Sequence, residues 1–119
     1  MEPVGVGLLG VGTVGSGVAR LLREHGDRIA RRAGRPVQLR WAVVRDPSKP
    51  RDVPLGETRV VTDPDKVIAD PEVAVVIETM GGTDLAFTLI LKALAAGKHV
   101  VTANKALLAE RGPEIFAQA

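Results

Sequence analysis

Three glycines near the start of the chain have the spacing of a phosphate-binding turn. Gly10, Gly12 and Gly15 form Gly-x-Gly-x-x-Gly, with an apolar run over 4–9 before them and a helix-like segment after them. In such a turn the first glycine permits the tight bend, the second lets backbone approach the phosphates, and the third lets the helix pack closely on the strand. Free N–H groups and the helix dipole then face the anion. The pattern predicts a pyrophosphate site for a dinucleotide; the alternative is a glycine-rich turn without a ligand.

Arg45 and Asp46 are the candidates for contact with the adenosine ribose. They follow an apolar run over 37–44, which we expect to form the second strand. At the end of this strand in dinucleotide-binding folds, an acidic residue binds the ribose hydroxyls of NAD, whereas an arginine accommodates the 2′-phosphate of NADP. Arg45, with Lys49 and Arg51 in the following loop, favours NADP over NAD. The alternative is an ordinary charged turn in which both side chains face water.

Lys105 is the candidate for catalysis. It ends the run Thr102-Ala103-Asn104-Lys105, which we expect at the junction of a strand and a helix. An ammonium there would stabilise negative charge developing on a carbonyl oxygen and help a proton to move; the alternative is a solvated surface lysine. We expect Glu78 to accept hydrogen bonds from nearby loop N–H groups, and we expect no role for His25 and His99.

The composition excludes several other classes of protein. The 119 residues suffice for one domain, and 45% hydrophobic with 25% charged residues is ordinary for a soluble chain. A net charge of +2 is too small to indicate nucleic-acid binding, and the lack of cysteine excludes disulfides, thiol catalysis and zinc–thiolate sites. No secretory signal and no apolar run of about 18 residues is visible. We therefore expect a cytoplasmic protein that binds no membrane, no nucleic acid and no metal.

Strands and helices alternate along the chain and must position these residues. Strands are predicted over 4–9, 37–44, 59–62, 73–77 and 98–102. A helix is predicted after the glycines, with Val14, Val18, Leu21 and Leu22 facing the sheet. Further helices are predicted over 27–33, 64–69, 83–96 and 104–110. Gly112 and Pro113 should open one more helix. The alternation predicts an α/β fold with a doubly wound parallel sheet, a Rossmann-type domain over 1–119. Its ligand crevice should lie beyond the carboxyl ends of the strands.

Three segments resemble homoserine dehydrogenase. They are Gly-Leu-Leu-Gly-Val-Gly-Thr-Val-Gly-Ser-Gly-Val (7–18), Val-Ile-Glu-Thr-Met-Gly-Gly (76–82) and Ala-Gly-Lys-His-Val-Val-Thr-Ala-Asn-Lys-Ala-Leu-Leu-Ala (96–109). The Thr-Ala-Asn-Lys-Ala element is the most specific, because sugar-type oxidoreductases share Ala-Gly-Lys-His-Val but continue with Glu-Lys-Pro. The resemblance covers essentially the whole chain and corresponds to the N-terminal nucleotide-binding domain of that family.

The resemblance implies an activity and a set of roles. The family interconverts L-homoserine and L-aspartate 4-semialdehyde by hydride transfer with NAD or NADP, on the way to threonine and methionine. It implies that Lys105 contacts cofactor and substrate and that Arg45 reads the adenosine ribose or its phosphate. The residues implied to hold the pyrophosphate are Gly10, Val11, Gly12, Thr13, Val14 and Gly15. Those implied to line the nicotinamide half are Thr79, Gly81, Gly82, Thr102 and Asn104.

The family's substrate-binding and dimerising domain would follow residue 119. On that expectation the chain is part of a longer, homo-oligomeric enzyme, and alone it would bind cofactor with little or no turnover, because positioning of the substrate contributes about 7–11 kcal/mol to such steps. Two alternatives stay open: another oxidoreductase of the same layout, of the sugar or semialdehyde type, and a stand-alone nucleotide-binding module. Thr102 to Lys105 in place of Glu-Lys-Pro, and the lack of a catalytic cysteine, count against the first. The position of Lys105 counts against the second.

Overall fold

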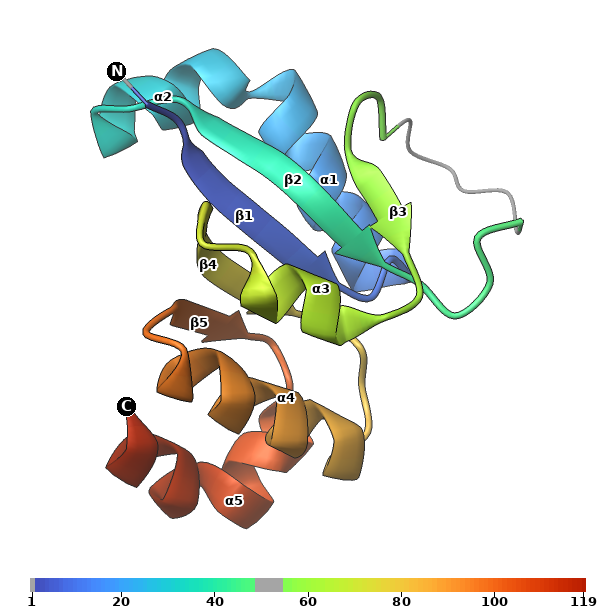
Figure 1. The fold of residues 1–119 in the computed structure, drawn as a ribbon, viewed down its shortest axis with the longest axis vertical. Helices are drawn as coiled ribbons and strands as arrows, with labels where there is room; N and C mark the ends of the chain where they lie inside the picture. The colour runs from blue at the N-terminus through green and yellow to red at the C-terminus, as the bar shows by residue number, and fades with distance from the viewer. Residues whose placement is uncertain (1, 49–54) are drawn as a thin grey trace.

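Five parallel strands form one sheet at the centre of the computed structural model, which describes residues 2–48 and 55–119 (Figure 1). The sheet has the spatial order β3-β2-β1-β4-β5, and each neighbouring pair is parallel. The strands are β1 (Val4–Leu9), β2 (Val37–Val43), β3 (Arg59–Val61), β4 (Val73–Glu78) and β5 (His99–Thr102). The predicted doubly wound parallel sheet is confirmed, and the strand order reverses between β1 and β4.

Helices cover both faces of this sheet. The helices α1 (Thr13–Glu24) and α2 (Gly26–Ala33) contact β2 on one face, while α3 (Pro64–Ala69) and α4 (Asp84–Ala95) contact β4 on the other. The last helix, α5 (Lys105–Gln118), packs on α4 (Figure 1). The Asp63 carboxylate accepts from the Asp65 N–H at 2.9 Å and caps the start of α3.

The central strand β1 is buried on both of its faces. Leu8 packs with Ala19 of α1, whereas Leu9 packs with Val67 of α3 and Leu89 of α4. Successive side chains of a strand point to opposite faces, so adjacent leucines serve two separate cores. A parallel strand covered on both sides requires such a continuous apolar run.

The face that α1 turns to the sheet differs from the prediction. Val14 is 54% exposed and Leu21 is 53% exposed, whereas Gly15 and Ala19 are buried. The prediction was therefore wrong for Val14 and Leu21. Gly15 and Ala19 are small and lie one turn apart, so they let the helix backbone approach the strands closely. This close approach, and not the size of the apolar side chains, determines which face of α1 meets the sheet.

Two helix boundaries also differ from the prediction. The predicted helix over 104–110 and the helix expected from Gly112 form one continuous α5, with Pro113 inside it. Pro113 removes one backbone donor, but Leu107 and Ile115 on either side of it are buried against α4 and hold the helix together. Asp27 lies in the first turn of α2 instead of capping it, because α2 begins at Gly26 after His25.

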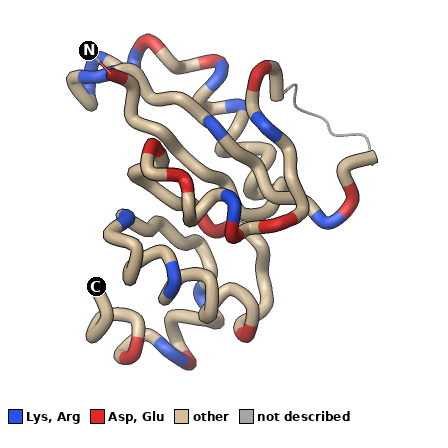
Figure 2. Tube along the Cα trace, in the orientation of Figure 1, with Lys and Arg blue, Asp and Glu red and all other residues tan. Residues whose placement is uncertain are grey.

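Charged residues are interspersed along the chain trace (Figure 2). The densest basic group, Arg28, Arg31, Arg32 and Arg35, lies on or just after α2, and all four side chains are exposed. These four arginines therefore form part of the solvated surface. In the two described ranges, none of the helices combines the length and the hydropathy needed to cross a membrane.

Candidate cofactor-binding site

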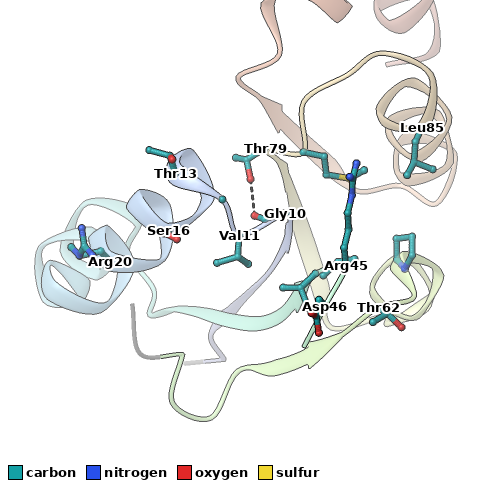
Figure 3. Close-up of a pocket in the computed structure, with 15 residues that line it drawn as sticks. Gly10, Val11, Thr13, Ser16, Arg20, Arg45, Asp46, Thr62, Thr79 and Leu85 are labelled. Carbon is teal, nitrogen blue, oxygen red and sulfur yellow. Dashed lines mark hydrogen bonds between the residues drawn. The ribbon is translucent and has the colours of Figure 1, made fainter. Parts of the chain in front are cut away.

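A cavity of about 940 Å³ lies beyond the carboxyl ends of β1, β2, β3 and β4 (Figure 3). Its volume falls at the upper end of the roughly 300–1,000 Å³ of small-molecule sites. The lining residues are Gly10, Val11, Gly12, Thr13, Ser16, Arg20, Val43, Val44, Arg45, Asp46, Thr62, Pro64, Thr79, Met80 and Leu85. The cavity therefore lies where the strand order reverses, the place at which open α/β sheets bind ligands.

The three glycines of the first turn lie in three different geometric environments. Gly10 has φ of +99°, a conformation that residues with a Cβ rarely adopt. A Cβ on Gly15 would lie 2.1 Å from the Gly10 carbonyl oxygen and 2.8 Å from the Thr79 hydroxyl, so α1 can pack here only without one. A Cβ on Gly12 would meet no atom within 4 Å. Gly12 is thus the one of the three whose missing side chain leaves open space beside the cavity.

Thr79 fixes the glycine turn against the end of β4. Its hydroxyl donates to the Gly10 carbonyl at 2.8 Å, the dashed bond in Figure 3, and lies 3.2 Å from the Leu9 carbonyl. Its backbone N–H also donates to the Leu9 carbonyl, at 2.9 Å. These bonds join the ends of β1 and β4 across the point of reversal. The predicted cofactor residue Thr79 therefore lines the cavity, and its hydrogen bonds also fix the glycine turn that borders the cavity.

The start of α1 suits an anion. No side chain caps it, since its N-cap is Gly12, and its first turn contains no acidic residue. The N-terminal N–H groups of a helix and its dipole attract negative charge when nothing else satisfies them. Arg20, two turns along α1, and Arg45, after β2, add two cationic side chains to the cavity wall.

Arg45 and Asp46 are engaged differently. Arg45 is exposed, and in Figure 3 its side chain extends from the end of β2 in the direction of Leu85. Asp46 accepts hydrogen bonds from Ser48, from its N–H at 3.0 Å and its hydroxyl at 2.6 Å. Asp46 is therefore an acceptor within its own turn. The predicted helpers Lys49 and Arg51 lie outside the described residues.

Several predicted site residues do not line this cavity. Gly15 is buried beneath it, and Val14 is exposed on α1. Lys105 is exposed at the first position of α5, and Asn104 before it is the N-cap, accepting from the Leu107 N–H at 3.0 Å. The other predicted residues outside the cavity lining are Gly81, Gly82 and Thr102. Their roles in binding stay predictions.

Sequence reasoning missed part of the cavity wall. Ser16 and Arg20 follow Gly12 at intervals of four residues, so they share one face of α1, and this spacing was a usable signal. Met80 and Leu85 also line the cavity. Their approach depends on how α4 leaves the sheet, and no local pattern in the sequence indicates it.

A parallel sheet with a glycine turn opening onto a cavity at the strand-order reversal defines a dinucleotide-binding domain of the Rossmann type. Residues 10–119 match the family model described as "Homoserine dehydrogenase, NAD binding domain". The chain belongs to this family. The match therefore favours homoserine dehydrogenase over the sugar-type oxidoreductases that the sequence alone left open.

Similar proteins agree with this assignment. The chain is 48% identical over its full length to a homoserine dehydrogenase of Pseudomonas aeruginosa and 44% identical to one of Bacillus subtilis. The crystal structure of a homoserine dehydrogenase from Thiobacillus denitrificans has a TM-score of 0.93 and 47% identity over the whole chain. This chain spans 27% of the Pseudomonas protein, 28% of the Bacillus protein and 27% of the Thiobacillus chain.

Proposed function

We propose that this chain is the nucleotide-binding portion of an NAD(P)-dependent homoserine dehydrogenase, which interconverts L-homoserine and L-aspartate 4-semialdehyde. The proposal rests on one observation. In this chain, which belongs to the homoserine dehydrogenase family, the glycine turn opens onto the cavity where the strand order reverses. The relatives extend well beyond the region that this chain covers. We expect the residues that hold the substrate to belong to that further region.

The residues present fit a dinucleotide. The uncapped start of α1 at Gly12 would take the pyrophosphate, and a Cβ placed on Gly12 would have no protein atom within 4 Å. Arg20 lies on the same helix face and would add charge toward the phosphates. The remaining length of the cavity, out to Arg45 and Thr62, would take the adenosine.

Arg45 supports a preference for NADP. The 2′-phosphate needs a cation, and Arg45 lines the cavity with an exposed side chain. NAD would need a carboxylate for its ribose hydroxyls, but Asp46 already accepts two bonds from Ser48. This difference between the two neighbours supports NADP over NAD.

Lys105 is the proposed catalytic residue of this chain. The bound nicotinamide supplies or accepts the hydride in this reaction. Lys105 would place its ammonium beside the substrate oxygen, stabilising the negative charge that develops as the carbonyl is reduced. Its place at the start of α5 is fixed by Asn104, whose side chain caps that helix.

An activity assay of the longer protein that contains this chain tests the proposal. L-aspartate 4-semialdehyde should be reduced with consumption of NADPH, and L-homoserine should be oxidised with its formation. The 119-residue chain should bind NADPH with little or no turnover. A longer protein that binds NADPH but reduces no aspartate semialdehyde would contradict the proposed activity. A homo-oligomeric state and a cytoplasmic location are further predictions of this assignment.

A further inference from the structure

Glu78 is a fully buried carboxylate at the carboxyl end of β4, with 0% of its surface exposed. It does not line the cavity, and no ion pair involves it within the described part of the chain. A buried carboxylate is costly unless hydrogen bonds satisfy its oxygens. The hydrogen bonds of Glu78 should therefore show what this buried carboxylate does beside the candidate site.

The two oxygens of Glu78 bind two different turns. The Met80 N–H, in the turn after β4, donates to Oε2 at 2.8 Å. The Thr102 hydroxyl, at the end of β5, donates to Oε1 at 2.6 Å. One buried side chain therefore links the segment entering Gly81 with the segment leading to Lys105.

Asn104 closes a ring of hydrogen bonds with the same two turns. Its N–H donates to the Thr102 hydroxyl at 3.0 Å, and its side-chain amide donates to the Gly82 carbonyl. Its side-chain oxygen accepts from Leu107 and starts α5. The ring runs from Glu78 through Met80 and Gly82 to Asn104 and Thr102, and back to Glu78. Displacing one turn must therefore strain the other.

The turn held by this ring has an unusual backbone. Gly81 and Gly82 both have positive φ, +77° and +70°. Two consecutive glycines in this conformation have many alternatives available, so an anchor on each side restricts them. Glu78 fixes the entrance of the turn through Met80, and Asn104 fixes its exit through Gly82.

We propose that Glu78 is a positioning residue for the nicotinamide half of the cofactor, acting through Met80 and Thr102. The inference rests on the proposed function, in which the turns at 79–82 and 102–105 surround the nicotinamide. The two carboxylate oxygens accept both bonds at once. Glu78→Leu removes both acceptors, whereas Glu78→Gln would keep both contacts, because its amide can donate to the Thr102 hydroxyl oxygen.

NADPH and 2′-phospho-ADP-ribose are the two probes, because the second is NADPH without the nicotinamide. Calorimetric titrations with both ligands should show that the unmodified chain binds NADPH more tightly. Glu78→Leu should weaken NADPH binding by about tenfold, in line with loss of the two buried hydrogen bonds, while 2′-phospho-ADP-ribose binding changes by less than about twofold. Thr102→Val should act in the same way, and Thr102→Ser, which keeps the hydroxyl, should recover most of the loss.

The same titrations separate this inference from the proposed function. If the unmodified chain binds neither ligand, the proposed function fails. If it binds both and Glu78→Leu leaves NADPH binding unchanged, or weakens both ligands equally, the positioning role is overturned. Equal affinity of the unmodified chain for the two ligands also overturns it. The Thr102→Val and Thr102→Ser pair keeps the test available if Glu78→Leu does not fold. Asp70→Asn at the opposite edge shows whether lost stability alone changes the ratio of the two affinities.

Discussion

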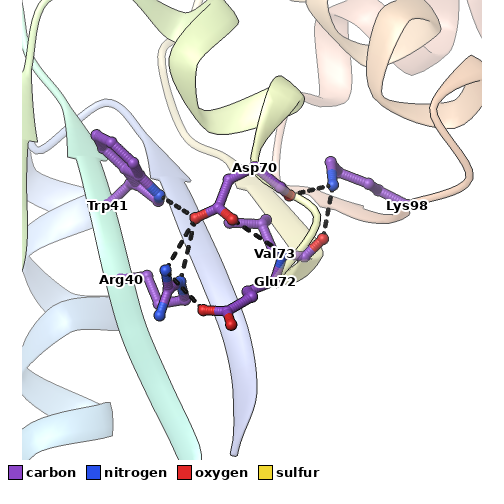
Figure 4. Close-up of polar contacts among 6 residues, drawn as sticks. All are labelled: Arg40, Trp41, Asp70, Glu72, Val73 and Lys98. Carbon is purple, nitrogen blue, oxygen red and sulfur yellow. Dashed lines mark hydrogen bonds and ion pairs between the residues drawn. The ribbon is translucent and has the colours of Figure 1, made fainter.

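Near the amino ends of β4 and β5, side chains from distant segments converge on Asp70, whereas at the carboxyl edge the chain turns on glycines around an open cavity (Figures 3 and 4). The Asp70 carboxylate accepts from the Trp41 indole N–H at 2.7 Å and from Arg40 at 3.1 and 3.2 Å. Lys98, almost fully buried, donates to the Asp70 and Val73 carbonyls at 2.8 and 2.7 Å. The amino edge is thus fixed by side chains.

The protonation of Asp70 reflects this arrangement. The hydrogen bond from Trp41 is the main cause that holds the pKa of Asp70 below its usual range, and bonds from the Glu72 N–H and from Arg40 add to it against the opposing effect of burial. Such contacts favour the charged carboxylate and stabilise the fold. At the carboxyl edge, the start of α1 instead has no side-chain cap. We therefore expect stability and cofactor binding to depend on opposite edges of the sheet, so that substitutions can change them separately.

The largest expected effect concerns turnover and the carboxyl edge. Lys105→Ala in the longer protein should lower kcat by about 10²–10³, because one electrostatic contact made in the transition state is lost. Substrate KM should change less, and the melting temperature should not change, since Lys105 is exposed. Lys105→Arg should restore little, because a planar guanidinium replaces a compact ammonium poorly. Lys66→Ala, at an exposed lysine on α3, is the matched control; a kcat for Lys105→Ala within a few-fold of this control would remove Lys105 from the chemistry.

A smaller effect should distinguish the two cofactors at the same edge. Arg45→Ala should weaken NADP(H) binding by about 1.5–3 kcal/mol, the size of a charge-assisted hydrogen bond. NAD(H), which lacks the 2′-phosphate, should change much less. Calorimetry with both cofactors measures this, and Arg31→Ala on α2 is the control for a lost surface charge. Equal losses for both cofactors, or none, would exclude a phosphate-reading role.

The smallest effect should appear at the amino edge and in stability alone. Asp70→Asn should lower the free energy of unfolding by about 1–2 kcal/mol, because the amide cannot accept from Trp41, Arg40 and Glu72 as the carboxylate does. The affinity for NADPH should stay within about twofold of the unmodified chain. Chemical denaturation and calorimetry on the same variant measure both quantities. A clear loss of affinity would show that the two edges are coupled.

The same carboxylate gives a pH dependence with a defined sign. Because folding lowers the pKa of Asp70, its contribution to stability is fully present above the ordinary aspartate pKa of about 3.9 and is lost as pH falls through the lower folded-state value. The stability difference between the unmodified chain and Asp70→Asn should therefore be constant between about pH 5 and 7 and shrink below about pH 4. Thermal unfolding across this range checks it, and a difference that grows on acidification would refute the assignment.

Local signals in the sequence predicted much of this fold. The apolar run of β1 and the glycines after it act over a few residues, and the structure confirms their geometry. Val18 packs on the core as predicted. Val14 and Leu21 were mispredicted because the face of α1 that meets the sheet follows from close packing of Gly15 on Thr79, which is distant in sequence. The Asp70 contacts join residues about 30 positions apart and leave no local pattern. The binding roles of Lys105 and Thr102 stay predictions.

Titration of NADPH into the Gly12→Val variant tests the central claim most directly, namely that the turn at Gly10 to Gly15 binds the pyrophosphate. The variant should fold, because a Cβ at Gly12 meets no atom within 4 Å and its φ of −88° lies outside the left-handed region. Gly17→Val in the same helix has equal space and does not line the cavity, so it is the matched control. We expect Gly17→Val to bind NADPH like the unmodified chain and Gly12→Val to lose binding at an unchanged fold. Unchanged NADPH affinity in a folded Gly12→Val variant would contradict the account.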